Sequence, residues 1–270
     1  MDSDSAFDED DYYHRKEVCS ISSVYLNDSV VHLQKINNIT IVRDDLLCGG
    51  TKSRYVEKIL NPNYDNYVYV CSPFGGLQVC LSVVVEQFNQ ADMGHRRVHI
   101  FAERPLNGVS AYQKFAEEMG AIYHWIDGDW NQMELEANQF ADSHDNTYII
   151  PNGFDTPEAN REISAVATQL RNKIGSYDYV VSVAGSGSLT RGLQDGKLGL
   201  NYLAVGVFNG RPNIGAAKFI QYPLEFNQRV FDDQMPPFPS TKHYDAKGWT
   251  YAVQLAKQYP QKRILFWNVM

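Results

Sequence analysis

One stretch decides how the rest of this sequence is interpreted: Arg43-Asp44-Asp45-Leu46-Leu47-Cys48-Gly49-Gly50-Thr51-Lys52-Ser53-Arg54-Tyr55-Val56-Glu57. It follows an apolar, β-branched run at 39–42, which predicts a strand, and it leads into residues 55–60, which predict a helix. Lys52 therefore lies at a helix start, where the helix dipole disfavours a cation and favours the neutral amine. A neutral amine is what imine formation with an aldehyde requires. The same position also fits an ordinary solvated lysine, and position alone leaves both interpretations open.

Composition excludes several classes of protein. The chain has 270 residues, enough for one large or two modest domains. Its net charge is −8 and the sequence has no dense basic cluster, so we expect no stable binding to duplex nucleic acid, although a basic patch formed only in the fold stays open. We see neither an apolar run long enough to cross a bilayer nor a secretory signal, so we expect no membrane association and a cytoplasmic location. The histidines and the four cysteines lack metal-ligand spacing, so no metal site is expected, and Cys71 and Cys80 are predicted to be reduced core residues.

Beyond residue 60, short apolar runs alternate with amphipathic segments. The runs lie at 67–71, 98–102, 121–125, 147–150, 179–183, 202–208, 218–222 and 263–267. Most are continuously apolar, which is typical of buried parallel strands with helices on both faces of the sheet. Ligands bind such sheets at the carboxyl ends of strands, so the loops after residues 42, 71, 150 and 183 should carry the site. Residues 1–14 are rich in aspartate and glutamate and predict a disordered acidic tail.

The lysine segment resembles the lysine motif of pyridoxal-phosphate enzymes with the tryptophan synthase β-subunit fold, called fold type II. The matching positions are Arg43-Asp44-Asp45-Leu46 and Gly49-Gly50-x-Lys52-x-Arg54-x-x-Glu57, and the nearest branch is that of D-cysteine desulfhydrase and 1-aminocyclopropane-1-carboxylate (ACC) deaminase. The resemblance implies an α/β protein with two three-layer αβα domains and mainly parallel sheets. Residues 53–148 would form the smaller domain, and 15–52 with 149–270 the larger one. Pyridoxal 5'-phosphate would lie in the cleft between them, bound to Lys52 as a Schiff base.

A second glycine loop follows the run at 179–183 and enters a predicted helix. Backbone N–H groups freed by glycine at a helix N-terminus make an anion site, although such a loop is often only a tight turn. The loop resembles the Gly-Ser-Gly-Gly-Thr phosphate cradle of fold type II enzymes, with Ser188 and Leu189 in place of the last two residues. The resemblance implies that the cofactor phosphate is held by Gly185, Ser186, Gly187, Ser188, Leu189 and Thr190. Ser186, Ser188 or Thr190 would replace the lost hydroxyl.

The loop after residue 71 is similar to a Gly-Gly-x-Gln-Ser-Asn segment of the same branch. Gly75, Gly76 and Gln78 match it, while Val79 and Cys80 replace the catalytic serine and the asparagine that contacts the cofactor ring. The resemblance places Gly75, Gly76, Leu77, Gln78 and Val79 at the substrate and Cys80 at the cofactor. A valine can neither transfer a proton nor attack carbon. A less solvated substrate carboxylate loses CO2 more readily, so we expect decarboxylation, with a related elimination as the alternative.

Two further segments complete the predicted site. Pro151-Asn152-Gly153 is similar to a Pro-x-Gly-Gly segment, with Phe154 in place of the second glycine. This likeness places Gly153 and Phe154 at the substrate, where Phe154 would stack near the cofactor or fill the domain interface. Tyr244-Asp245-Ala246-Lys247 looks like a segment near the cofactor's ring nitrogen, which implies a catalytic acid or base at Tyr244. Asp245 or Asn268 would face the ring nitrogen; a plain turn tyrosine and a solvated aspartate are the alternative.

Together these features predict a pyridoxal-phosphate-dependent lyase that acts at Cα of an amino acid. The substrate is expected to be a free amino acid or, alternatively, an amino acid attached to a larger molecule such as a hypermodified DNA base of the phage type. A third interpretation is a protein that binds the cofactor without catalysis. Many relatives in the family are dimers, so a homodimer is an open expectation.

Overall fold

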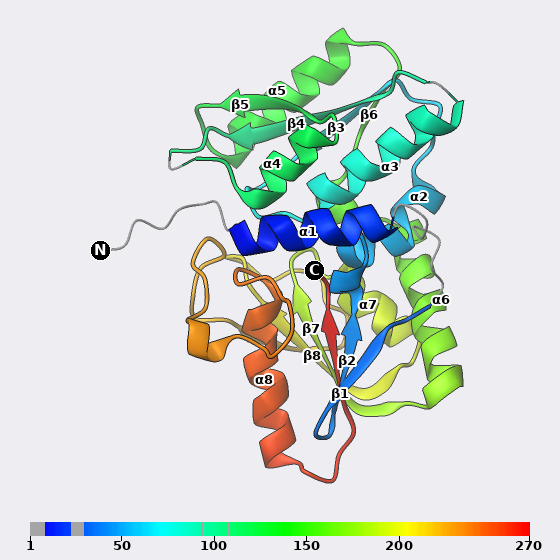
Figure 1. The fold of residues 1–270 in the computed structure, drawn as a ribbon, viewed down its shortest axis with the longest axis vertical. Helices are drawn as coiled ribbons and strands as arrows, with labels where there is room; N and C mark the ends of the chain where they lie inside the picture. The colour runs from blue at the N-terminus through cyan, green and yellow to red at the C-terminus, as the bar shows by residue number, and fades with distance from the viewer. Residues whose placement is uncertain (1–8, 23–29, 93, 107) are drawn as a thin grey trace. The chain divides into compact units, whose positions relative to one another are not determined.

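The computed structural model describes residues 9–22, 30–92, 94–106 and 108–270. The chain divides into two compact units, each considered by itself below (Figure 1). Unit 1 comprises Met1–Leu26 and Val56–Phe154, and unit 2 comprises Asn27–Tyr55 and Asp155–Met270. The main segment of unit 1 thus starts and ends a few residues later than the predicted smaller domain, 53–148.

Unit 2 is built on a six-stranded sheet in the order β1-β2-β10-β7-β8-β9. Its strands are β1 (Leu33–Ile36), β2 (Ile39–Arg43), β7 (Tyr177–Ala184), β8 (Gly199–Gly206), β9 (Lys218–Gln221) and β10 (Ile264–Asn268). All neighbouring pairs are parallel except β1 and β2. The C-terminal strand β10 therefore lies between β2 and β7, and all five of its residues are buried.

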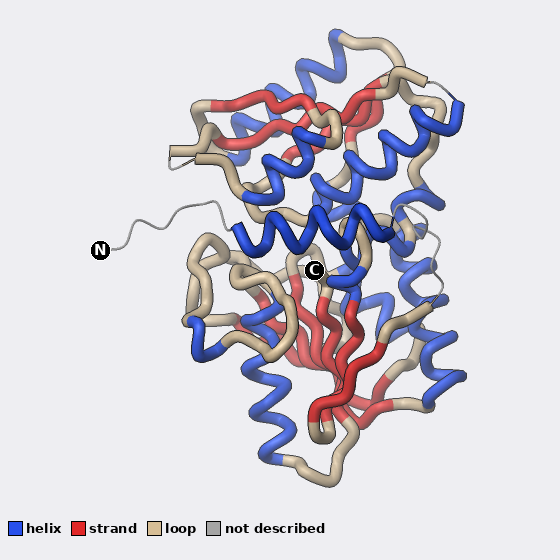
Figure 2. Tube along the Cα trace, viewed as in Figure 1, coloured by secondary structure: helices blue, strands red, loops and turns tan. Residues whose placement is uncertain are grey.

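Helices cover both faces of this sheet (Figures 1 and 2). They are α6 (Pro157–Ile174), α7 (Ser188–Asp195) and α8 (Asp245–Gln258), with 3-10 turns η1 (Asp44–Leu46), η2 (Gly50–Arg54) and η4 (Asp232–Gln234). Alternation along β7 separates the two layers, since successive side chains of a strand point to opposite faces. Val183 packs against Gly248 of α8, whereas the hydroxyl of Ser182 meets Thr190 of α7. Helix α6 starts at the predicted N-cap, because Thr156 Oγ1 accepts a hydrogen bond from Ala159 N.

Unit 1 has a four-stranded, fully parallel sheet in the order β5-β4-β3-β6. Its elements are α1 (Glu9–Ser22), α2 (Val56–Ile59), β3 (Asn66–Val70), α3 (Leu77–Asp92), β4 (Arg97–Glu103), α4 (Ala111–Glu118), β5 (Ile122–Ile126), α5 (Trp130–Ser143), β6 (Thr147–Ile149) and η3 (Asn152–Phe154). Helix α5 covers one face of the sheet, over Val68, Val70 and Phe101, and α3 and α4 cover the other (Figure 1). Each unit is thus a three-layer αβα sandwich, as predicted.

The predicted acidic tail is wrong for residues 9–14, which belong to helix α1. Helix α1 packs against α4 within unit 1, and Tyr12 is only 4% exposed. Tyr12 donates a 2.5 Å hydrogen bond to Glu118 Oε1, and Lys16 forms an ion pair with the same carboxylate. Charge counting missed the helix because it takes no account of the buried side chains of α1, Tyr12 and Val18. Residues 1–8 of the predicted tail lie outside the described residues.

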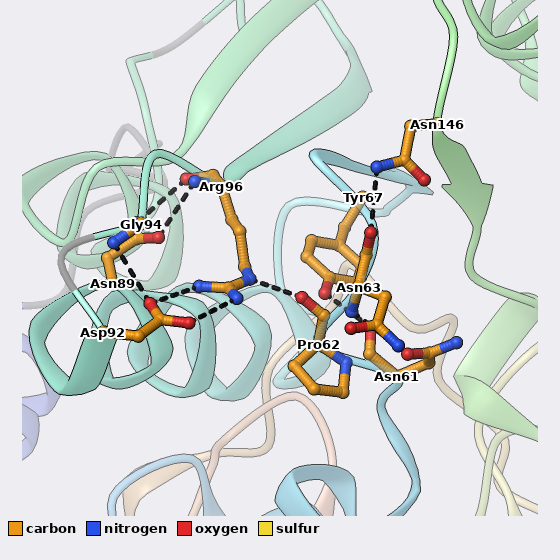
Figure 3. A network of polar contacts seen from close by, with 9 residues as sticks. All are labelled: Asn61, Pro62, Asn63, Tyr67, Asn89, Asp92, Gly94, Arg96 and Asn146. Atoms are coloured by element: carbon orange, nitrogen blue, oxygen red, sulfur yellow. Dashed lines mark hydrogen bonds and ion pairs between the residues drawn. The ribbon is translucent and has the colours of Figure 1, made fainter.

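A polar network fixes the segment that leads from α2 into β3 (Figure 3). Arg96 donates to Pro62 O at 2.5 Å and forms two hydrogen bonds with Asp92, at 2.8 and 2.7 Å. Tyr67 donates to the carbonyl of residue 61, and Asn146 donates to that of residue 63. The turn is therefore held to the end of α3 and to the start of β6 by side chains from three other parts of unit 1.

Candidate active site

The carboxyl ends of β2, β10 and β7 lie at one edge of the unit 2 sheet, because these strands are adjacent and parallel. Strand β2 is followed by η1 and η2, which carry Lys52, and β7 is followed by the loop Gly185–Gly187 and helix α7. Neighbouring strands are about 5 Å apart, so the two segments start about 10 Å from each other. We call this region the carboxyl edge. It brings the lysine segment and the second glycine loop together, as the sequence predicted.

Asp44 organises the backbone that carries Lys52. Its carboxylate is fully buried and accepts hydrogen bonds from Thr51 Oγ1 at 2.8 Å and from Trp267 Nε1 at 2.9 Å. Both Nε and a terminal nitrogen of Arg54 donate to the same carboxylate. Side chains before and after Lys52 are therefore tied to one anion, which fixes the turn between them.

Gly50 allows a close approach of the chain to this turn. Its φ is +66°, and a Cβ added there would collide with Val269 O. The neighbouring Thr51 N donates to the same carbonyl at 2.9 Å. A side chain at position 50 would break that contact, which explains why the lysine motif needs glycine at this point.

Asn268 has a different role from the predicted one. Its Nδ2 donates to Asp45 Oδ1 at 2.7 Å and to Pro239 O at 2.9 Å, and its Oδ1 accepts from Ser240 at 2.8 Å. The side chain is fully buried, and both amide hydrogens are already engaged. Register explains the difference, because Asn268 lies opposite Arg43 in the sheet and so faces the turn after β2. The structure therefore offers no donor from Asn268 to a cofactor ring.

The second glycine loop has the geometry of an anion cradle. Gly187 is left-handed, with a φ of +90°, and an added Cβ would collide with Asn213 O. The first N–H groups of a helix have no partner within the helix, and the dipole adds positive potential there. The backbone of Ser186, Gly187, Ser188 and Leu189 thus offers donors at the carboxyl edge.

The hydroxyl groups of this loop are mostly committed to protein partners. Thr190 is fully buried, and its hydroxyl lies 2.9 Å from that of Ser182 in β7, so the predicted phosphate contact from this side chain is wrong. Ser188 Oγ donates to Asp155 Oδ1 at 2.5 Å. Ser186, which is partly exposed, has the hydroxyl of Ser188 as its neighbour at 3.3 Å. Ser186 is therefore the best placed of the three predicted hydroxyls.

Sequence reasoning missed Asp155 and Arg191, which flank the loop. The Arg191 guanidinium forms an ion pair with Asp155 and also donates to Asn213 O. These contacts fasten the start of α7 to two neighbouring segments of unit 2. Nothing in the spacing of the residues pointed to them, because the contacts join positions far apart in the sequence.

Tyr244 supports the loop with its hydroxyl group. The hydroxyl accepts from Gly185 N at 2.8 Å and donates to Val183 O at 3.2 Å. Burial raises the pKa of Tyr244 above its usual value, so it stays protonated. Its proton is committed to a backbone carbonyl, which argues against the predicted role as acid or base. Asp245 is fully buried rather than solvated, and its Oδ2 accepts from Thr241 Oγ1 and from Met270 N.

The predicted substrate loop lies in unit 1, where Gln78 organises it. Gln78 Nε2 donates to Gly75 O at 2.8 Å and to Pro73 O at 3.1 Å, and its Oε1 accepts from Tyr123 at 2.7 Å. Gly75 and Gly76 are partly exposed before α3, whereas the side chains of Leu77, Val79 and Cys80 are at most 1% exposed. Cys71 and Cys80 are buried free thiols, as predicted.

Gly153 and Phe154 both have left-handed backbones, with φ values of +66° and +55°. Phe154 is 2% exposed. Bulky side chains rarely adopt this conformation. The position thus keeps the backbone that glycine favours, although it carries a phenylalanine.

Two absences hold for the part of the chain that the structure describes. No three histidine, cysteine, aspartate or glutamate side chains there are grouped so as to hold a metal ion. No helix there is long and apolar enough to cross a membrane.

Solved structures with the same fold cover nearly the whole chain. An ACC deaminase homologue matches with a TM-score of 0.73 at 15% identity, over 93% of this chain and 94% of its own. A cysteine synthase from Entamoeba histolytica matches with a TM-score of 0.66 at 14% identity, over 90% and 85%. A fungal L-serine ammonia-lyase from Rhizomucor miehei matches with a TM-score of 0.62 at 11% identity, over 89% and 92%.

No protein-family model and no curated protein matches the sequence. The predicted fold, that of the tryptophan synthase β-subunit and of fold type II enzymes, is confirmed by the structural matches. Identities of this size show the fold alone. The nearer likeness to the D-cysteine desulfhydrase and ACC deaminase branch stays a prediction.

Proposed function

We propose that this chain is a pyridoxal-phosphate-dependent lyase that breaks a bond at Cα of an amino acid. The observation that carries the proposal is the carboxyl edge of unit 2. There the Lys52 turn and an anion cradle follow two strands that flank β10 in a parallel sheet. The solved structures that share the fold include an L-serine ammonia-lyase and a cysteine synthase, which supports amino-acid chemistry.

The residues present fit the cofactor. The amine of Lys52 would hold its aldehyde, and the amides at the start of α7 would hold its phosphate. Asp245, a buried carboxylate, would keep the ring nitrogen protonated. When bound, pyridoxal phosphate supplies an electron sink for negative charge that develops at Cα. Asp44 and Arg54 would hold the lysine turn in place while the substrate reacts.

Decarboxylation is the reaction that we favour. Val79 has no atom that can carry a proton, and neither Val79 nor Cys80 is exposed. The polar groups that would serve a deaminase at these positions are therefore missing. An apolar setting for the substrate carboxylate favours loss of CO2, because the charge disperses as the bond breaks.

Covalent labelling tests the cofactor assignment. Purified protein is incubated with pyridoxal phosphate, reduced with borohydride, digested and analysed by mass spectrometry. We expect a pyridoxyl group on Lys52 and its loss in Lys52→Ala, whereas Lys58→Ala, an exposed lysine in α2, keeps it. Labelling spread evenly over surface lysines would contradict the proposal.

A product assay on a panel of amino acids tests the reaction. We expect CO2 and the corresponding amine; ammonia with an oxo acid and no CO2 would establish elimination instead. The same panel attached to a larger carrier, such as a nucleoside, tests whether the substrate is conjugated. Labelling of Lys52 without turnover of any compound would favour a binding protein, an alternative that the loss of polar groups at 79 and 80 supports.

A further inference from the structure

Lys247 of helix α8 is a fully buried lysine for which the proposed chemistry gives no role. Its Nζ donates a 2.6 Å hydrogen bond to Glu225 O. The ammonium also lies 5.7 Å from the ring centroid of Tyr222 and 6.0 Å from that of Phe226, within reach of a cation–π interaction. Across the described residues of both units, no carboxylate forms an ion pair with it. The cation is thus held by one carbonyl and two ring faces of the segment 222–226.

The segment 222–226 contacts the support of the second glycine loop. Phe226 stacks on Phe208, with centroids 4.1 Å apart, and meets the ring of Tyr244 edge-on at 6.3 Å. Phe208 and Tyr244 both lie close to Gly185. A Cβ added to Gly185 would lie 3.2 Å from Phe208 and 3.3 Å from the Tyr244 hydroxyl. An unbroken series of contacts therefore runs from the Lys247 ammonium to the first residue of the anion cradle.

A buried lysine lowers the stability of the fold unless other interactions compensate for the burial of its ammonium group. Burying an ammonium without a counter-ion disfavours the charged form, and burial lowers the pKa of Lys247 to about 8. The tyrosines around it, Tyr222, Tyr244 and Tyr251, have pKa values raised by burial, so they stay neutral in that range. The nearest carboxylate along the helix, Asp245, is held by Thr241 and Met270 N. Lys247 is thus held by the carbonyl of Glu225 and by the rings of Tyr222 and Phe226 rather than by a carboxylate.

We propose that Lys247 is a positioning residue of the anion cradle, and that its ammonium keeps Phe226, Phe208 and Tyr244 packed against Gly185. The cradle is ordered while this side chain holds the segment 222–226, and it loosens when a side chain that can form neither the hydrogen bond nor the cation–π contacts replaces Lys247. For cofactor affinity, the inference rests on the function proposed above. For the order of the loop, it stands without it.

Amide hydrogen exchange on the cofactor-free protein tests the order of the loop. We compare wild type with Lys247→Met, which keeps the length and loses the charge, and with Lys247→Arg, which keeps the charge. Lys257→Met, an exposed lysine of the same helix, is the matched control. We expect Lys247→Met to lower protection of the peptide that contains Gly185 about tenfold, the effect of losing one charge-assisted hydrogen bond. Lys247→Arg should restore part of it, and Lys257→Met should match wild type.

Two further readings separate a local effect from general unfolding. Peptides from β2 and β10 should keep their protection in Lys247→Met; a uniform loss would show a purely structural lysine and overturn the inference. Because burial lowers the pKa of Lys247, the packed state binds this proton less tightly than a loosened state does, so protection of the Gly185 peptide, corrected for intrinsic exchange, should not fall between pH 7 and 9 in wild type. If wild type binds no pyridoxal phosphate but these results hold, the proposed function fails and the positioning role stands. Equal protection in wild type and Lys247→Met would overturn the positioning role whatever the cofactor does.

Discussion

Replacing Asp44 by asparagine should be among the most damaging single changes at the carboxyl edge. Asp44 is fully buried and accepts four hydrogen bonds, from Thr51, Trp267 and two nitrogens of Arg54. Asparagine keeps one acceptor oxygen and turns an NH2 group toward these donors. It also leaves a nearly buried guanidinium without its counter-ion. Removing one partner of a buried ion pair costs about 3–5 kcal/mol, so we expect the free energy of unfolding to fall by that amount.

Urea denaturation, followed by tryptophan fluorescence and circular dichroism, measures this loss. The matched control is Glu158→Gln, because Glu158 pairs with Arg161 at the surface, where the two side chains are 52% and 67% exposed. Exposed pairs contribute about 0–1 kcal/mol, so this variant should unfold close to wild type. Arg54→Met adds a second reading. If the two groups act as a pair, the double variant should lose less than the sum of the single losses.

The Asp44→Asn substitution should also loosen the backbone turn that carries Lys52. Thr51 and Arg54 are both tied to Asp44, so the turn between them should exchange amide hydrogens faster in Asp44→Asn. The yield of pyridoxyl-Lys52 after reduction should fall with it. An Asp44→Asn protein that unfolds within 1 kcal/mol of wild type and is labelled equally at Lys52 would refute this account of the turn.

Three other predictions concern unit 1. Burial lowers the pKa of His99 to about 4, against an unfolded value near 6.5, so the unfolded chain takes up the proton first and the free energy of unfolding should fall by about 3 kcal/mol at most as the pH drops from 6.5 to 4. This pH dependence of the free energy of unfolding should be weaker in His99→Phe, and an equal dependence in both proteins would count against the prediction. At Phe154, where φ is +55°, the Phe154→Gly variant should be more stable than Phe154→Ala by about 1 kcal/mol. At Phe115 in helix α4 the alanine variant should be the more stable one, and the same order at both sites would disprove backbone strain at Phe154. Arg96→Met should lower the free energy of unfolding in urea by about 1–2 kcal/mol, because Pro62 O and Asp92 lose a charged donor. Arg104→Met, which removes a surface ion pair, should lower it by less than about 1 kcal/mol, and equal losses would argue against a stabilising network in Figure 3.

Local patterns were enough to predict the layers and the positions of the two glycine loops in the chain. Continuous apolar runs became parallel strands, and the two glycine loops followed β2 and β7 because strand order put both at one edge of the sheet. The glycines at 50 and 187 also behave as their spacing indicated, since each has a positive φ and touches a backbone carbonyl. The strands and the glycine conformations depend on residues close together in the sequence, whereas the strand order joins residues far apart.

What the sequence could not predict is which partner each polar side chain takes in the fold. Thr190 was expected to face a phosphate, but its hydroxyl meets Ser182 because α7 lies on the sheet with that side inward. Asn268 meets Asp45 through the register of β10 against β2, and the ends of that contact are 223 positions apart. Tyr12 of the acidic helix α1 meets Glu118, which is 106 positions away in the sequence. In each case the sequence shows that the side chain is polar, but it does not show which group it contacts.

The pairing of charges at the carboxyl edge limits how an anion can be held there. Arg43 pairs with Asp45, Arg54 with Asp44, and Arg191 with Asp155, so each guanidinium is neutralised by a carboxylate of unit 2. These arginines add order to the turns but little net positive charge. A phosphate must then depend on the amides at the start of α7, where the helix dipole places about half a positive charge. Changes to the arginines should therefore act mainly on stability, whereas a side chain at Gly187, which would move the backbone away from Asn213 O, should act on anion affinity.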